Sequence, residues 1–168
     1  AVGIRDRLPR RVTIVEVSPR DGLQRWIGAA AAIFDDRGRI LLVRHNYQRH
    51  NWEIPGGGGE PGESAAETAR REVREELGLD VEIVRLAGVY WEAHWREGQD
   101  GHHFVFLCRP AEGARPRIAD PKEIADLGYF DIADLPRPIS DFTVLRIRDA
   151  ASGAVPRLTT IGPRVWLE

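Results

Sequence analysis

One stretch of this chain decides its fold: residues 56–79 read Gly-Gly-Gly-Gly-Glu-Pro-Gly-Glu-Ser-Ala-Ala-Glu-Thr-Ala-Arg-Arg-Glu-Val-Arg-Glu-Glu-Leu-Gly-Leu. The glycines allow the backbone to come close to a ligand. Ser64 is a favourable N-cap, and Glu67 three residues later completes a capping box. No helix breaker follows until Gly78, a residue type that commonly ends helices. The stretch therefore predicts a glycine-rich loop joined to a helix that runs from Ser64 to Leu77.

The predicted helix carries three neighbouring glutamates. Glu72, Glu75 and Glu76 stand at positions i, i+3 and i+4, so their side chains lie close together. Each like-charge pair costs about 0.2–0.5 kcal/mol on an exposed helix unless a cation neutralises it. A solvated acidic face is the alternative reading of these residues. One face of the helix is apolar and should pack on the core, and it consists of Ala65, Ala69, Val73 and Leu77.

This stretch resembles the Nudix box, the signature of a family of hydrolases. The family pattern is Gly, five residues, Glu, seven residues, Arg-Glu, an aliphatic residue, any residue, Glu-Glu, any residue, Gly and an aliphatic residue. In this chain the nine specified positions are Gly57, Glu63, Arg71, Glu72, Val73, Glu75, Glu76, Gly78 and Leu79. A pattern with this many fixed positions is far more specific than a lone glycine motif.

The resemblance implies an α/β fold, the Nudix-type α/β/α sandwich with a mixed β-sheet. Strands that pair as hairpins and also flank a helix favour the same architecture. We expect an N-terminal extension over residues 1–25, which could add a strand, and a Nudix domain over 26–151. A C-terminal tail over 152–168 would pack on the domain or on a partner.

The resemblance also implies a metal site. Glu72, Glu75 and Glu76 would bind the cation, and the backbone carbonyl of Gly56 would be a further ligand. Mg²⁺ prefers oxygen ligands of this kind, and Mn²⁺ accepts them too. Arg71 is expected to orient Glu75 or the glycine loop.

Hydrolysis also needs a general base and contacts to the substrate. The family places the base differently in different members, so Glu76, Glu123 and Glu53 all stay open. The histidine pair at 102–103 could stack on a base or ribose, but only one of two strand neighbours can face the site. Other substrate contacts are expected from residues close to the glycine loop: Arg44, Trp52, Glu53 and Gly57.

These features predict a metal-dependent hydrolase that cleaves a pyrophosphate bond. Its substrate would be a nucleoside diphosphate linked to another moiety, such as a nucleotide sugar, or a nucleoside triphosphate. Family members that act on ADP-ribose tend to carry a proline downstream of the box, and those that act on diadenosine polyphosphates a tyrosine. Residues 92–96 contain neither, so the substrate stays open. A non-catalytic nucleotide-binding or sensor module on the same fold is the alternative.

Residues 11–24 carry a second resemblance. They are similar to the opening strand and metal-site motif of the hydroxymethylglutaryl-CoA lyase family, in which the pair equivalent to Arg20 and Asp21 serves substrate and metal. That family folds as a TIM barrel, which needs about 200 residues or more, and fewer follow here. A lyase fragment is therefore disfavoured, and a relic or a repurposed edge strand is expected.

Composition excludes several classes of protein. The chain has 168 residues, 42% of them hydrophobic, and a net charge of −2, as expected for one globular domain. Scattered arginines and no basic stripe argue against binding to a nucleic acid polymer. No apolar run approaches the length of a membrane span, about 20 residues. The single Cys108 lies in an apolar run and should be a buried thiol, which agrees with a cytoplasmic location. The family resemblance suggests a homodimer.

The remaining elements follow from hydrophobic runs and turn signals. The strands expected at 26–34 and 40–44 should form a hairpin across the turn at 35–38. Those at 81–91 and 102–109 should pair antiparallel across a turn at 98–101. A last helix should begin at Ser140 or Asp141 and end near Ala151. Further short strands are expected at 12–17 and 127–131.

Overall fold

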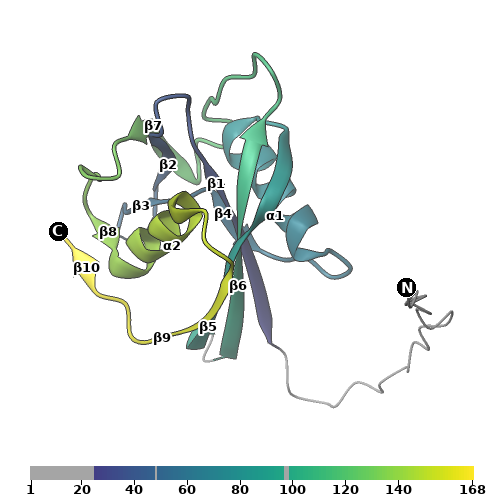
Figure 1. The fold of residues 1–168 in the computed structure, drawn as a ribbon, viewed down its shortest axis with the longest axis vertical. Coiled ribbons are helices and arrows are strands. Elements are labelled where there is room, and N and C mark those ends of the chain that lie inside the picture. Colours follow the sequence, from purple (N-terminus) through teal and green to yellow (C-terminus); the bar gives the residue numbers. More distant parts are fainter. Residues whose placement is uncertain (1–24, 48, 97–98) are drawn as a thin grey trace, which may run out of the picture.

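The computed structural model describes residues 25–47, 49–96 and 99–168. In chain order the elements are β1 (Trp26–Ile33), β2 (Ile40–His45), β3 (Trp52–Glu53), β4 (Gly56–Gly58), α1 (Ala65–Leu77), β5 (Val81–Arg96), β6 (Gln99–Pro110), β7 (Ile124–Phe130), β8 (Ile139–Ser140), α2 (Asp141–Ser152), β9 (Arg157–Ile161) and β10 (Trp166–Leu167) (Figure 1). The strand expected at 12–17 and the lyase-like segment at 11–24 lie outside the described residues. The division at residues 25 and 151 stays a prediction.

The strands form two five-stranded sheets. The first has the order β4-β1-β6-β5-β9, in which β1 runs antiparallel to β4 and parallel to β6. The second has the order β10-β8-β3-β2-β7, in which β3 runs parallel to β8 and antiparallel to β2. Both sheets are therefore mixed, as predicted.

Strand β1 lies between two hydrophobic cores. Because side chains alternate along a strand, Ala29, Ala31 and Ile33 join the core beneath α1. The side chains between them, Ala30 and Ala32, join the core beneath α2. The two helices lie on opposite sides of the strands (Figure 1), so the predicted α/β/α sandwich is confirmed.

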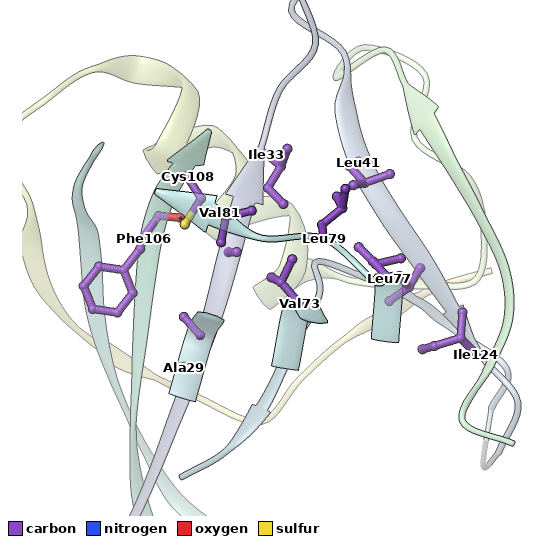
Figure 2. Close-up of a cluster of buried hydrophobic side chains, with 13 residues drawn as sticks. Ala29, Ile33, Leu41, Val73, Leu77, Leu79, Val81, Phe106, Cys108 and Ile124 are labelled. Atoms are coloured by element: carbon purple, nitrogen blue, oxygen red, sulfur yellow. Dashed lines mark hydrogen bonds between the residues drawn. The ribbon is translucent and has the colours of Figure 1, made fainter. Parts of the chain in front are cut away.

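The apolar face of α1 packs as its spacing predicts. Ala69, Val73 and Leu77 are fully buried, and Ala65 packs at the edge of the same cluster. Figure 2 shows Val73 and Leu77 among side chains contributed by the strands. Burial of a Val or Leu side chain contributes about 1.5–3 kcal/mol. This face therefore fixes the rotation of α1, and with it the position of Glu72 and Glu76 next to the glycine strand.

The hairpin expected from the strands at 26–34 and 40–44 is wrong. β1 and β2 belong to different sheets, and a single isolated bridge between Phe34 and Ile40 joins their ends. Both edges of β1 are already taken by β4 and β6, whereas β2 pairs with β3 and β7. The turn between them forms as expected, since the Asp35 carboxylate accepts hydrogen bonds from the N–H groups of Arg37 and Arg39.

The other predicted elements are present, and some are longer than expected. β5 and β6 pair antiparallel, and β7 begins before the expected strand, at Ile124. Ser140 is the N-cap of α2, because its hydroxyl accepts a hydrogen bond from the Thr143 N–H. The tail packs on the domain: β9 pairs with β5, and β10 pairs with β8.

Two predictions from composition can be compared with the structure. Cys108 is a free thiol in the core, and burial raises its pKa to about 12. Within the described ranges, no helix is long and apolar enough to cross a membrane.

Candidate active site

Helix α1 presents its glutamates to the glycine strand β4. The helix begins at the capping box formed by Ser64 and Glu67 and ends at Gly78, whose φ of 61° is left-handed. Both ends were predicted from the sequence. The caps thus set the two ends of the helix and its apolar face sets the rotation, and Glu72 and Glu76 lie beside the glycine backbone.

Glu76 is the most deeply buried of the three box glutamates. Its side chain accepts a hydrogen bond of 3.1 Å from the Gly56 N–H, and the residue is only 4% exposed. Burial raises its pKa well above the usual value, and the neighbouring carboxylates of Glu72, Glu123 and Glu53 raise it further. A cation bound nearby would offset this burial and repulsion, because an opposite charge favours the charged form of a carboxylate.

Glu72 packs directly against the glycine strand. A Cβ atom on Gly57 would lie 2.5 Å from the Glu72 Oε1 atom, so no larger residue fits there without moving this carboxylate. At Gly56, where φ is 157°, a Cβ atom would lie 2.4 Å from the Ala29 carbonyl oxygen. A side chain would therefore clash at both glycines, with the neighbouring strand at Gly56 and with the Glu72 carboxylate at Gly57.

Arg71 links the helix to the loop before it. Its guanidinium donates to Glu63 at 2.8 Å, to the Gly58 carbonyl at 2.8 Å and to Glu72 at 3.0 Å. It also donates to Glu75 at 2.9 Å. Its contacts to Glu63 lower the pKa of that carboxyl to about 2. These contacts are compatible with the orienting role expected from the sequence, and that role stays a prediction.

The three box glutamates do not converge on one point. Glu75 is 57% exposed and is held by Arg71, and among the described residues no group of three His, Cys, Asp or Glu side chains is arranged to hold a metal ion. Glu72 and Glu76 do lie together at the glycine backbone. Together with backbone oxygens and waters they offer the oxygen ligands that Mg²⁺ and Mn²⁺ prefer. These ligands fit the divalent cation that the sequence predicts.

Glu123 lies on the loop before β7. The Glu123 side chain is exposed, while its carbonyl oxygen accepts a hydrogen bond of 2.7 Å from the Asn46 N–H. Its charge raises the pKa of both Glu72 and Glu76. The base candidate from the sequence is thus close enough to act electrostatically on the box glutamates.

A cavity of about 530 Å³ opens beside the glycine strand, within the size range typical of small-molecule sites. Its wall joins residues from the strands, from α2 and from the C-terminal tail. They are Ala29, Ala30, His45, Tyr47, Asn51, Glu53, Ile54, Gly56, Gly57, Gly58, Glu92, His103, Phe104, Arg146, Arg164 and Trp166. Two of the expected substrate contacts, Glu53 and Gly57, are among them.

One buried ion pair in the cavity wall joins Glu53 to Arg146 of α2. The Arg146 Nη2 atom lies 2.7 Å from Glu53 Oε1, and the Thr143 hydroxyl donates to Glu53 Oε2 at 2.8 Å. Burial raises the pKa of Glu53, but the charges of Arg146 and Arg164 outweigh it, so the pKa is lowered. A carboxylate with these partners is poorly suited to accept a proton, which disfavours Glu53 as the base.

A second ion pair, partly buried, joins Glu92 of β5 to Arg164 of the tail. The Arg164 Nε and Nη2 atoms lie 2.9 and 2.6 Å from the two Glu92 oxygens. The His103 Nε2 atom lies 2.9 Å from Glu92 Oε2. Burial raises the pKa of Glu92, yet the bonds to His103 and Arg164 prevail and lower it to about 2. His103 lines the cavity and His102 does not, as the strand alternation predicts.

The structure does not bring every expected residue to the cavity. Trp52 is buried in the core beneath α2, edge-on to Phe130, and Arg44 lies over the Trp52 ring at 5.9 Å. Neither lines the cavity, so their roles as substrate contacts stay predictions. The sequence reasoning missed Arg146 and Arg164, since nothing in their local sequence marks them.

Comparison with known proteins places this geometry in context. A family model described as the NUDIX domain matches residues 24–147. The 8-oxo-dGDP phosphatase of Mus musculus is 32% identical over 120 residues, which are 70% of this chain and 36% of that protein. The chain therefore spans about a third of the length of this relative. A MutT-like protein of Streptomyces ambofaciens is 28% identical over 132 residues, 79% of this chain and 80% of that protein.

Two solved structures are also similar. The MutT NUDIX hydrolase of Burkholderia pseudomallei has a TM-score of 0.67 and 31% identity, and the match covers 75% of this chain and 98% of that one. A UDP-X diphosphatase has a TM-score of 0.66 and 26% identity, with 82% and 68% coverage.

Proposed function

Since this chain belongs to the Nudix family, we propose that it is a metal-dependent hydrolase that cleaves a pyrophosphate bond in a nucleotide. One observation carries the proposal: the buried Glu76 and the half-buried Glu72 lie beside the glycine strand that borders the cavity. The substrate would be a nucleoside diphosphate linked to another moiety or a nucleoside triphosphate. UDP-X, in the name of one similar structure, belongs to this class, whereas 8-oxo-dGDP, in the name of the mouse relative, is an unlinked nucleoside diphosphate that shares the pyrophosphate bond.

Glu72, Glu76, Glu75 and the Gly56 carbonyl would hold the cation, which is Mg²⁺ with Mn²⁺ as a substitute. When bound, it would neutralise charge on the phosphates and lower the pKa of a water. Arg71 orients two of these ligands, since it donates to both Glu72 and Glu75. We therefore assign Arg71 a supporting role in catalysis.

Glu123 is our candidate for the general base. Its side chain is exposed, and its charge acts on Glu72 and Glu76. A general base needs a carboxylate oxygen that is free to accept a proton and within reach of the attacking water. Glu53 is tied to Arg146 and Thr143, and Glu76 is committed to the cation, so Glu123 is preferred over both.

The cavity would hold the substrate with its phosphates toward β4. Gly57 lines the wall next to Glu72, and Glu53 and Arg146 form a polar part of the same wall. A cytoplasmic location and a homodimer complete the proposal. The first is supported by a free, buried Cys108, and the second only by the family resemblance.

A substrate screen tests the proposal. The full chain would be incubated with Mg²⁺ and 8-oxo-dGDP, dGDP, 8-oxo-dGTP, UDP-glucose, ADP-ribose and the common dNTPs, and the products identified. We expect metal-dependent cleavage of at least one pyrophosphate bond, abolished by Glu76→Gln. Tight nucleotide binding with no turnover in Mg²⁺ or Mn²⁺ would instead favour a non-catalytic sensor.

A further inference from the structure

The C-terminal segment, residues 153–168, lies beyond the family match, which ends at residue 147. Two of its residues nevertheless line the cavity, Arg164 and Trp166. Part of the candidate site is therefore built by a segment to which the family signature assigns no role.

Backbone contacts hold this segment at the start of α2. The Asp141 N–H donates to the Val165 carbonyl at 2.9 Å, and the Val165 N–H donates to Asp141 Oδ1 at 2.9 Å. One residue further on, Trp166 lies opposite Ser140 in the sheet. Because Val165 is fixed on both sides, the Arg164 backbone has little freedom, and its side chain reaches inward from a defined point.

The Arg164 side chain reaches across to β5. Its two contacts to Glu92 form a bidentate pair, a geometry that fixes the carboxylate plane as well as its position. The guanidinium also lies 4.8 Å from the centre of the Phe142 ring. Glu92 in turn contacts His103, so one residue of the C-terminal segment orders two buried polar side chains of the cavity wall.

The surfaces around this pair suit a nucleoside. Phe104, His103 and Trp166 supply aromatic surface, and Glu92 supplies an acceptor close to a histidine nitrogen. Nucleobases combine a flat aromatic face with donor and acceptor edges, which this combination can contact. Inorganic phosphates offer no such face, so they would gain nothing from these residues.

We propose that Arg164 is a positioning residue that holds Glu92 and His103 in place to bind the nucleoside part of the substrate. The inference rests on the proposed function and extends it to the C-terminal segment. Removing the guanidinium leaves Glu92 buried without its bidentate partner, which frees the side chain to change rotamer. Loss of such charge-assisted contacts corresponds to about a ten- to hundredfold loss of affinity.

Calorimetry on the full chain tests this proposal. Arg164→Ala, Arg164→Lys and the wild type would be titrated in Mg²⁺ with GDP, UDP, ADP and inorganic pyrophosphate, which has no nucleoside. Where a diphosphate is turned over, kcat and KM replace Kd. Arg157→Ala is the matched control, since it removes an exposed arginine of the same segment. Thermal unfolding verifies that each variant is folded. If Arg164→Ala does not fold, only Arg164→Lys is compared with the wild type.

We expect Arg164→Ala to raise Kd or KM about ten- to hundredfold for the nucleoside diphosphates that the wild type binds. Pyrophosphate binding should stay within about twofold, and Arg164→Lys should be intermediate because it cannot form the bidentate pair. The inference would be overturned if Arg164→Ala lost as much affinity for pyrophosphate as for the nucleoside diphosphates, or lost none for any nucleoside diphosphate. It would also be overturned if the wild type bound no nucleoside diphosphate more tightly than pyrophosphate. A wild type that binds nucleotides through Arg164 but never cleaves them would instead overturn the proposed function.

Discussion

Substitution of Gly57 by alanine should lower catalytic activity while leaving the stability of the fold nearly unchanged. The new Cβ atom would lie 2.5 Å from the Glu72 Oε1 atom and 2.6 Å from its carboxyl carbon. Ordinary contacts to a Cβ atom begin at 3.4 Å, so the carboxylate has to move by roughly 1 Å. Such a misplacement in an active site can cost about a hundredfold in rate.

The fold should tolerate the same change. The clashing atoms are the end of a flexible side chain, and the backbone at Gly57 has no left-handed φ. We therefore expect kcat/KM to fall about a hundredfold, while the free energy of unfolding changes by less than about 1 kcal/mol.

Steady-state kinetics with a substrate found in the screen, at several Mg²⁺ concentrations, would measure the first effect, and urea unfolding the second. Gly59→Ala is the matched control: a Cβ atom there would lie 3.2 Å from the Thr68 hydroxyl and away from the box carboxylates. A Gly57→Ala enzyme whose kcat/KM stays within about twofold of wild type would refute the reasoning, because Glu72 would then not need its present position.

Three further predictions concern the buried charges. Glu76→Gln should raise the Tm of the metal-free protein at pH 8, because burial and nearby carboxylates raise the Glu76 pKa and so disfavour its charged form in the folded state; a lower Tm in EDTA would contradict this. Glu53→Ala should lower the free energy of unfolding in urea by about 3–5 kcal/mol, because it leaves the Arg146 charge buried and unpaired. The control Glu168→Ala removes an exposed ion pair with a 3.5 Å contact and should lower it by less than about 1 kcal/mol. The pKa of Glu92 is lowered from 4.5 to about 2, so its stabilising contribution is fully present above pH 4.5 and is lost as the pH falls through 2. Parallel Tm profiles of the wild type and Glu92→Gln over this acidic range would refute that last expectation.

The sequence predicts α1 almost completely because its signals are local. The capping pair of Ser64 and Glu67 and the terminator Gly78 lie within one turn of the positions that they control. The core face repeats at helical spacing, so its rotation follows from the pattern alone. The placement of Glu72 and Glu76 beside the glycines then follows from the chain connection.

Strand pairing could not be predicted in the same way. The turn at residues 35–38 has a hairpin signal and forms as expected, yet β1 and β2 enter different sheets. A turn fixes only its own geometry, whereas pairing is a competition between all strands that can reach an edge. β4 and β6 pair with the two edges of β1. The sequence around the turn contains no information about either of these strands.

The same distinction explains which half of the candidate site was found. The part proposed to hold the cation depends on residues of α1 and the loop before it, whose relative positions are set by short-range geometry. The ion pairs of Glu53 with Arg146 and of Glu92 with Arg164 join residues 93 and 72 positions apart, and no spacing rule links them. The box specifies neither of these long-range pairs. Substrate choice in this chain is therefore to be sought in the contacts that α2 and the C-terminal segment make with β5 and β6, and not in the box.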